Sequence, residues 1–360
     1  MENTNNEQDK YLSLALSLAK KANPSPNPRV GAVVVKDNKI IGQGYHKSAG
    51  EGHAEITAIN SVKNKNELKD ATLYATLEPC SHYGKTPPCT EAIINAGIKH
   101  VVIGCIDQNP KVDGVEELKK HEISVEVLND RECYEINEGF FHWIKTSKSF
   151  VMLKLAMTLD GRIATKTGHS KYISNSQSRA LSYAWRDNFD AILVGINTVL
   201  IDNPKLTSRT SDAKNPMRIV VDSHLRIPIT AQVLEPNARR IIATTEKHDK
   251  NKKRQLESMG VEMLILPEEK PDHINLKTLL EELGKKEITS VMVEGGAELA
   301  TALLDNNLIN KCAFFVAAKI LGSGKSAFEG KGVEKMDDAW QLKNTAIRKV
   351  GDDVLIIGYF

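Results

Sequence analysis

The chain has 360 residues, of which 41% are hydrophobic and 26% charged, and its formal net charge is +2. A chain of this length exceeds what one hydrophobic core usually fills, so we expect two domains, and the nearly balanced charge argues against a nucleic-acid or membrane surface. No segment has the cationic start of a signal peptide or the roughly 18 apolar residues of a membrane span, so we expect a cytoplasmic protein.

The first half of the sequence predicts a small α/β unit. Apolar residues from Tyr11 to Ala19 recur at helical spacing, and "RVGAVVVKDNKIIGQGYH" predicts two strands around an Asp37-Asn38 turn. The next segments are "HAEITAINSV", expected to be helical, the strand "ATLYATLEPC", the helix "CTEAIINAGI" ending near Gly97, and the strand "HVVIGCI". The expected order of elements is therefore α-β-β-α-β-α-β.

The second half begins after a polar stretch around "HWIKTSKS". We place the boundary near Ser147, which gives a first domain over residues 1–146 and a second over residues 147–360. Helical segments alternate with apolar runs that we expect to be strands: "FVMLKLAMT", "DAILVG", "MRIVVD", "RRIIAT", "VEMLIL", "TSVMVEGG", "KCAFFVAAKI" and "DVLIIGYF". This pattern predicts a mostly parallel sheet with a late antiparallel edge. The lysine-rich "KHDKNKKRQLESMG" predicts a solvated helix start.

The cysteines divide into two kinds. Five cysteines are few and odd in number, so we expect reduced thiols and no disulfide framework. Three of them lie in or near apolar runs and are expected to pack in the core: Cys105, Cys133 and Cys312. The other two, Cys80 and Cys89, each follow a proline.

The stretch from His53 to Cys89 predicts a zinc site. Hydrolysis at zinc requires three protein ligands and one open position, and His53, Cys80 and Cys89 supply that number. Cys89 begins a predicted helix, where the helix dipole favours a thiolate. Glu55 shares the first turn of the helix that His53 opens, so its carboxylate can transfer protons without being a ligand. The alternative is a pair of structural cysteines beside a capped helix.

The elements "GHAE", "LEPC" and "SHYGKTPPC", together with "PNPRVGAVVV" and "DQNP", resemble the deaminase half of the bifunctional riboflavin-biosynthesis deaminase-reductases. Eight residues separate the two cysteines, where other zinc deaminases have P-C-x-x-C. The resemblance implies a cytidine-deaminase-like α/β/α domain in which Asn27 and His46 read the pyrimidine, Lys85 meets the phosphate, and Asn109 lines the pocket. After Asn109 the family usually has a glycine-rich A-G-x-G loop, and this chain has the shorter "NPKVDGVEELKK".

Polar residues in the second half also suggest a pocket. Lys154 lies in the otherwise apolar strand "FVMLKLAMT", and a buried lysine is costly unless it is paired or functional. Ligands of open α/β sheets collect at loops that follow strands. The loop after "AILVG" carries three polar candidates, namely Thr198, Asp202 and Arg209.

A Gly-Gly pair follows another predicted strand. "VMVEGGAELATALL" places Glu294, Gly295 and Gly296 before a helix, whose free N–H groups could hold a pyrophosphate. The segment lacks the G-x-G-x-x-G fingerprint of conventional dinucleotide folds, so a tight strand-helix turn is the alternative.

From about Phe150 to Leu321, these segments resemble the reductase half of the same enzymes, a fold similar to dihydrofolate reductase, and imply a second α/β domain. The resemblance implies that NADPH contacts eleven residues: Met157, Tyr172, Thr198, Asp202, Ser223, Gly295, Gly296, Ala297, Glu298, Leu299 and Ala300. The implied substrate contacts are Ser170, Arg186, Leu206, Arg209 and Glu294. The family often has Trp at position 172 and Asp at position 203. Candidates for the 2′-phosphate of NADPH are Ser223, Arg239 and Arg240.

The resemblance implies an enzyme that acts twice on one pyrimidine ribotide. Zinc-dependent hydrolytic deamination of 2,5-diamino-6-ribosylamino-4(3H)-pyrimidinone 5′-phosphate is followed by NADPH-dependent reduction of the ribosyl group to ribityl. Glu55 is expected to carry protons in the first reaction, and Lys154 and Glu294 to polarise and orient the reacting group in the second. The expected partners are this small-molecule substrate and further copies of the chain in a homo-oligomer.

Two other classes of protein remain open. A nucleic-acid base deaminase would need a basic groove and stacking aromatic residues, against which stand the net charge of +2 and the 5% aromatic content. A non-catalytic module in which zinc only braces the fold would need a fourth protein ligand. His82 is the nearby candidate for that ligand.

Overall fold

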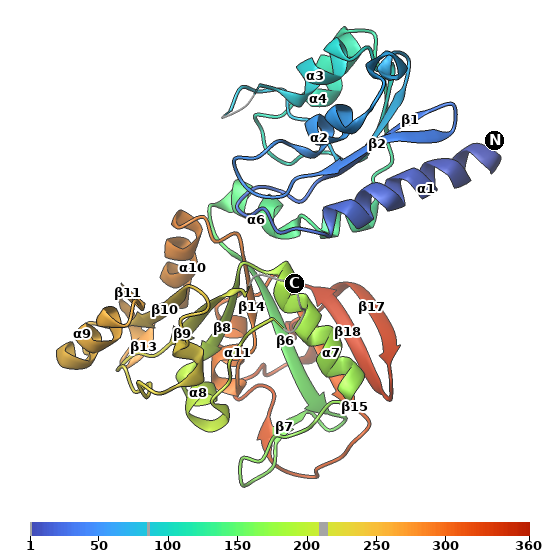
Figure 1. Ribbon diagram of the computed structural model, residues 1–360. Coiled ribbons are helices and arrows are strands. Elements are labelled where there is room, and N and C mark those ends of the chain that lie inside the picture. Colours follow the sequence, from blue (N-terminus) through green and yellow to red (C-terminus); the bar gives the residue numbers. More distant parts are fainter. Residues whose placement is uncertain (1, 85–86, 209–214) are drawn as a thin grey trace. The chain divides into compact units, whose positions relative to one another are not determined.

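The structure is a computed structural model that describes residues 2–84, 87–208 and 215–360, with side chains from residue 9 onward. The chain divides into two compact units, Met1–Ser147 and Lys148–Phe360 (Figure 1). No helix within the described ranges is long and apolar enough to cross a membrane.

The first unit is built on a five-stranded sheet in the order β2-β1-β3-β4-β5. β1 pairs antiparallel with β2 and β3, whereas β3, β4 and β5 run parallel. The strands are β1 (Gly31–Lys36), β2 (Lys39–Tyr45), β3 (Thr72–Leu77), β4 (His100–Cys105) and β5 (Ser124–Val127). The helices are α1 (Glu2–Ala19), α2 (Ala54–Ser61), α3 (Cys89–Asn95), α4 (Gly114–Lys120), α5 (Arg131–Glu135) and α6 (Glu138–Thr146), with a 3₁₀ turn η1 (Lys65–Leu68).

Helices cover both faces of this sheet because its central strands are apolar on both sides. Successive side chains of a strand point to opposite faces. In β1, Ala32 and Val34 pack into one buried cluster with residues of α2 and α3, while Val33 and Val35 pack into another with Tyr11 of α1. The unit is therefore a three-layered α/β/α domain that holds β3 and β4 in its interior.

The second unit contains a nine-stranded sheet in the order β11-β10-β9-β8-β14-β6-β15-β18-β17. The strands from β11 to β15 are parallel, and β18 and β17 add an antiparallel edge. These strands are β6 (Phe150–Thr158), β8 (Ala191–Gly195), β9 (Met217–Val221), β10 (Arg240–Thr244), β11 (Glu262–Ile265), β14 (Ser290–Val293), β15 (Lys311–Ala317), β17 (Lys343–Val350) and β18 (Asp353–Tyr359). Two small antiparallel pairs join β7 (Arg162–Ala164) to β16 (Lys325–Ser326), and β12 (Glu268–Lys270) to β13 (His273–Ile274).

Connecting helices lie on the two faces of this sheet (Figure 1). They are α7 (Ser176–Trp185), α8 (Ile196–Asp202), α9 (Lys250–Ser258), α10 (Leu276–Lys285) and α11 (Ala297–Asp305), with 3₁₀ turns η2 (Arg186–Asn188), η3 (Gln232–Leu234) and η4 (Met336–Asp338). Alternate residues of β6 enter different clusters, with Leu153 in one and Met152 in the other. The sheet is thus buried on both faces, and ligands reach it at the strand ends.

The element pattern read from the sequence is confirmed for the first seven elements and for the parallel sheet with its antiparallel edge. Four differences are found: two expected strands end early, and two strands were missed. The segment "EPC" forms a turn after β3 because Pro79 cannot continue the ladder, and the strand expected over residues 311–320 ends at Ala317. The short strand β5 and the exposed edge strand β17 were missed, because neither has a continuous apolar run.

Candidate active sites

The three expected zinc ligands come together in the first unit. His53 Nδ1 lies 3.2 Å from Cys89 Sγ and 3.5 Å from Cys80 Sγ, and the three candidate ligand atoms all lie within 4.8 Å of one another. His53 is the N-cap residue of α2, and Cys89 is the first residue of α3, preceded by Pro88. The N–H group of Cys89 donates to Cys80 Sγ at 3.3 Å, which joins the turn after β3 to the start of α3.

The chemistry of these donors fits zinc. Hydrogen bonds from the Cys89 thiol and from His53 lower the pKa of Cys80, whereas the bond to Cys80 and burial raise the pKa of Cys89, so Cys80 is the more acidic of the two thiols. One imidazole and two cysteine sulfurs are donors that zinc prefers, and three protein ligands leave a fourth position open. Within the described residues His82 is not part of the group, and its buried Nδ1 has no partner. The geometry therefore does not support the closed structural site.

Glu55 lies in the first turn of α2 and is 3% exposed. Burial, and next the charge of Cys80, raise the pKa of Glu55 to about 7. A carboxyl group with this pKa can accept and release a proton at neutral pH, which is the property of a general acid-base. Its position beside the metal ligands suits transfer of a proton rather than coordination.

Asn27 and His46 form a fixed pair beside this centre. The Nδ2 atom of Asn27 lies 3.0 Å from His46 Nε2, and His46 Nδ1 lies 3.2 Å from the carbonyl oxygen of Gly52. Because that carbonyl can only accept, Nδ1 carries the proton and Nε2 accepts from the Asn27 amide. Burial lowers the pKa of His46, so its ring is neutral at pH 7. The ring packs edge-on against His53 with centroids 5.2 Å apart.

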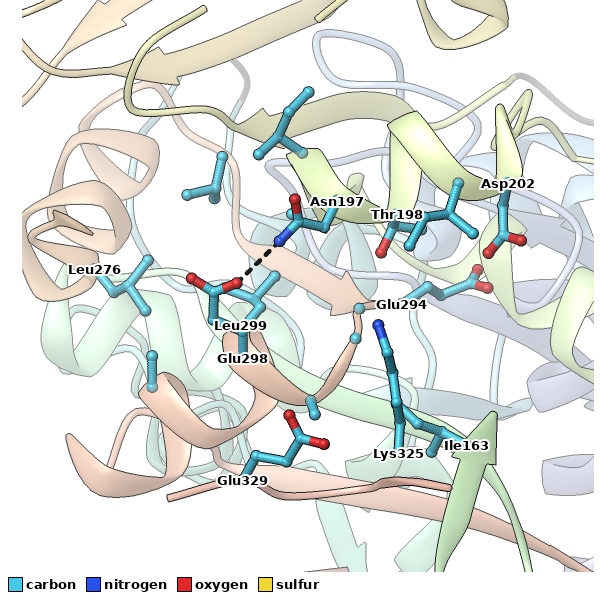
Figure 2. A pocket seen from close by; sticks show the side chains of 18 of the residues that line it. Ile163, Asn197, Thr198, Asp202, Leu276, Glu294, Glu298, Leu299, Lys325 and Glu329 are labelled. Atoms are coloured by element: carbon cyan, nitrogen blue, oxygen red, sulfur yellow. Dashed lines mark hydrogen bonds between the residues drawn. The ribbon is translucent and has the colours of Figure 1, made fainter. Parts of the chain in front are cut away.

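The second unit contains a cavity of about 800 Å³ at the carboxyl ends of β6, β8, β9 and β14 (Figure 2). Thirteen of the residues expected to bind the cofactor or the substrate line it: Lys154, Ser170, Arg186, Thr198, Asp202, Leu206, Ser223, Glu294, Gly295, Gly296, Ala297, Glu298 and Leu299. The strand-end position is where ligands bind in open α/β sheets.

Lys154, Arg186 and Glu294 form an ion triad in the cavity wall. Arg186 makes a two-pronged contact with Glu294, with Nε to Oε1 at 2.7 Å and Nη2 to Oε2 at 3.1 Å, and Lys154 Nζ lies 3.5 Å from Oε2. Burial opposes the charge on Glu294, but Lys154 and Arg186 outweigh it and lower the pKa of this carboxyl to about 2. Glu294 is therefore a fixed negative charge between two cations.

The start of α11 faces the same cavity. Gly295 and Gly296 precede the helix and line the cavity, and the first N–H groups of any helix lack intrahelical partners. These groups and the helix dipole suit a phosphate. Asn197 at the start of α8 donates from Nδ2 to Glu298 Oε2 at 3.0 Å, which ties the two helix starts together (Figure 2).

Some expected site residues lie elsewhere. Ala300 is fully buried and its N–H donates to Gly296 O inside the helix, so it offers no free donor to a phosphate. Met157 and Tyr172 are not among the lining residues, and Tyr172 is instead 65% exposed with the Arg179 guanidinium 4.2 Å from its ring centroid. Lys85 and Arg209 fall outside the described residues.

The two arginines considered for the 2′-phosphate do not line the cavity. Arg239 pairs with Glu262 at 2.7 Å, and Arg240 donates to the Leu234 carbonyl oxygen at 2.8 Å. Asn203 has a structural role. It ends α8 in the left-handed conformation, and its Oδ1 accepts the N–H of Gln232.

Sequence reasoning missed several polar residues of the cavity wall. Lys325 of β16 lines the cavity (Figure 2). Its segment lies where the recognised motifs end, and a lone lysine among glycines gives no signal. The segment expected as a loop after "AILVG" is helix α8, and Asn197 was missed although it adjoins Thr198 there. Its place at a helix start after a strand could have identified it.

Comparison with known proteins agrees with this division into two sites. The family model "Cytidine and deoxycytidylate deaminase zinc-binding region" matches residues 5–105, and the model "RibD C-terminal domain" matches residues 149–356. The riboflavin biosynthesis protein RibD of Aquifex aeolicus is 42% identical over 352 residues, which cover 96% of each chain. The protein of the same name from Escherichia coli strain K12 is 37% identical over 369 residues, covering 97% of this chain and 98% of that protein.

Solved structures give the same result. A diaminohydroxyphosphoribosylaminopyrimidine deaminase/5-amino-6-(5-phosphoribosylamino)uracil reductase from Thermotoga maritima is 36% identical, with a TM-score of 0.87 over 98% of this chain and 99% of that one. RibD of Acinetobacter baumannii is 34% identical, with a TM-score of 0.84 and the same coverage.

The fold and the two sites define a bifunctional enzyme, with a zinc-dependent deaminase and an NADPH-dependent reductase on one chain. The chain belongs to the RibD family of riboflavin biosynthesis.

Proposed function

We propose that the first unit deaminates 2,5-diamino-6-ribosylamino-4(3H)-pyrimidinone 5′-phosphate, and that the second reduces the ribosyl group of the product to ribityl. The observation that carries the proposal is the presence, in one chain, of the His53, Cys80 and Cys89 group beside Glu55 and of the ion triad beside the start of α11.

In the first reaction water adds to the ring carbon that bears the exocyclic amine, the C–N bond breaks, and ammonia leaves. His53, Cys80 and Cys89 would hold the zinc ion. Zinc supplies the acidity that deprotonates water near neutral pH. Glu55 takes the proton from the attacking water and delivers it to the departing amine, because burial raises its pKa to about 7.

Substrate recognition in the first unit would use fixed hydrogen-bonding groups. The neutral His46 and the Asn27 amide, held by their mutual contact, would read the pyrimidine edge. We assign Asn109 to the pocket wall and Lys85 to the phosphate.

In the second reaction a hydride is added to C1′ of the ring-opened imine, and a proton is added to the nitrogen. NADPH supplies the hydride. Glu294 stays ionised because its pKa is about 2, so it orients its partners and cannot donate the proton. Lys154, whose Nζ lies 3.5 Å from Glu294 Oε2, would polarise the imine nitrogen. Arg186 and Glu294, with Ser170 and Leu206, would hold the phosphorylated substrate.

The cofactor would lie along the strand ends of the second unit. The N–H groups from Ala297 to Leu299 would hold its pyrophosphate, and Thr198 and Asp202 of α8 would contact it from the facing side. Ser223, which follows β9 and lines the cavity, would meet the adenosine end.

The test supplies the diaminopyrimidine ribotide to the purified chain and follows ammonia release, zinc content and NADPH oxidation. We expect one zinc ion for each chain, one ammonia released for each substrate, and NADPH oxidised only after deamination. Ammonia release that is unchanged after zinc is removed would contradict the assignment of the first site. NADPH oxidation that does not require the deaminated product would contradict the order of reactions.

A homo-oligomer and a cytoplasmic location are further parts of the proposal. Sedimentation equilibrium of the purified chain tests the first, and fractionation of the source cells tests the second.

A further inference from the structure

The segment over residues 107–114, which contains most of the connection between β4 and α4 and the first residue of α4, carries Asn109 and is called the 107–114 loop. The Asn109 N–H donates to Asp107 Oδ1 at 2.8 Å, and Asn109 Oδ1 accepts the N–H of Lys111 at 3.1 Å. These bonds fix the side chain of Asn109, whose Nδ2 group has no partner among the described residues. The loop thus presents an oriented amide donor, although it is shorter than the usual glycine-rich loop.

Glu78 holds both ends of this loop. It is 6% exposed and follows β3, two residues before the metal ligand Cys80. Its Oε2 accepts the N–H of Asp107 at 3.1 Å, and its Oε1 accepts the N–H of Val115 at 2.9 Å. Its own N–H donates to the carbonyl oxygen of Cys105 at 3.0 Å. Each carboxylate oxygen therefore bonds to backbone on one side of the loop, and bonds to a charged acceptor are among the stronger ones.

Two more contacts join the loop to the turn that bears Cys80. Ser81 Oγ accepts the N–H of Asp113 at 2.8 Å. Gly114 lies so close to this turn that an added Cβ would be 2.0 Å from the Pro79 carbonyl oxygen. These hydrogen bonds and this close packing fix the loop against the turn that bears Cys80, and the buried Glu78 side chain supplies the bonds at both ends of the loop.

The contacts of Glu78 do not suit proton transfer. Both of its oxygens are engaged by backbone donors on the protein, whereas Glu55 lies beside the metal ligands. We propose that Glu78 is a positioning residue for deamination: it fixes the 107–114 loop against the Cys80 turn so that the Asn109 amide faces the substrate. This inference rests on the proposed deamination of the pyrimidine ribotide.

The main test compares Glu78→Gln with Glu116→Gln. Gln keeps the shape of the side chain, but its NH₂ group must face one of the two N–H donors, so one end of the loop is released. We expect KM for the diaminopyrimidine ribotide to rise about 10-fold, the loss of roughly one hydrogen bond to a charged acceptor. We expect kcat to change by less than about 3-fold, and zinc content and NADPH oxidation with deaminated substrate to stay unchanged. Glu116, an exposed residue of α4 paired with Lys119, is the matched control and should change neither constant.

A double-mutant cycle tests whether Glu78 acts through Asn109. Asn109→Ala should raise KM by a similar factor, and adding Glu78→Gln to it should raise KM little further, since residues that act through one contact are not additive. Gly114→Ala, which keeps every carboxylate but pushes the loop away from Pro79, should reproduce the rise in KM.

Loss of zinc from Glu78→Gln with KM unchanged would show that Glu78 only supports the metal-ligand turn, and would overturn the inference. Fully additive effects of the two substitutions, or unchanged kinetics in both Glu78→Gln and Gly114→Ala, would overturn it as well. Failure of the proposed function gives a different result, because the unsubstituted chain and Glu116→Gln would then release no ammonia.

Discussion

The two candidate sites use a buried glutamate in opposite ways. Glu55 is buried beside a thiolate, and its pKa rises to about 7. Glu294 is largely buried in the cavity wall but lies against Lys154 and Arg186, and its pKa falls to about 2. Burial beside a negative charge raises the pKa of a carboxyl group toward neutral pH, whereas burial against two cations lowers it and makes the group a fixed charge. The partner therefore decides the chemistry of each site, and the residue type does not.

The sites also differ in how far apart their parts lie in the sequence. His53 and Cys89 are 36 positions apart, whereas Arg186 and Glu294 are 108 positions apart. The first site is built around a strand and the starts of two helices, and the second from the ends of several parallel strands. A change in one site should leave the chemistry of the other intact.

The largest effect is expected from Cys89→Ser. A neutral hydroxyl is a much poorer zinc ligand than a thiolate, so the variant should lose both zinc and ammonia release. Metal analysis and an ammonia assay measure this, with Cys312→Ser, a buried cysteine of the second unit, as the control that keeps zinc. Full zinc occupancy with normal deamination in Cys89→Ser would remove the metal site as described.

Glu55→Gln should have the next largest effect. The amide keeps the shape of the side chain but cannot accept the proton of water, so deamination should fall by at least about 10²-fold with zinc still bound. NADPH oxidation with the deaminated substrate should stay near the unsubstituted rate. Ammonia release close to the unsubstituted rate would show that another group transfers the proton.

Lys154→Ala should affect the second site alone. If Lys154 polarises the reacting group as proposed, its removal should lower NADPH oxidation by about 10-fold to 10²-fold, while zinc content and ammonia release stay intact. Lys253→Ala is the control, since Lys253 pairs with Glu257 on α9 outside the cavity. Loss of both activities in a variant that stays folded by circular dichroism would mean that the sites are not independent.

The smallest expected effect is on the pH dependence of the free energy of unfolding. The pKa of Glu294 in the folded chain, about 2, lies below its ordinary value of 4.5, so its contribution is fully present above pH 4.5 and is lost as the pH falls toward 2. Between pH 7 and pH 3 we expect a loss of about 2 kcal/mol in the free energy of unfolding. Urea unfolding at each pH measures this loss. The unfolding transition of the second unit is the one that added NADPH moves to higher urea concentration, and Glu294→Gln should lack this part of the pH dependence. An equal pH dependence in both proteins would contradict the strong pairing of Glu294.

Much of the fold was predictable because its signals are local. Continuous apolar runs in β1, β6 and β8 predict strands buried on both faces, and this agrees with the structure. The exposed edge strand β17 was not predictable, since its side chains are polar or isolated and its pairing with β18 comes from the backbone. Strand pairing of this kind leaves little trace in the side-chain pattern.

The candidate metal group, with Glu55 as its expected proton carrier, was predictable from the sequence, because His53, Glu55, Cys80 and Cys89 lie at the ends of neighbouring elements. Which charges meet was not predictable and depends on the assembled fold. The fold paired Glu294 with Lys154 and Arg186, directed Arg239 to Glu262 away from the cavity, and left Ala300 in the core. The physical reason is that a charge is stabilised by what surrounds it in space, and residues distant in sequence become neighbours only when the strands have assembled.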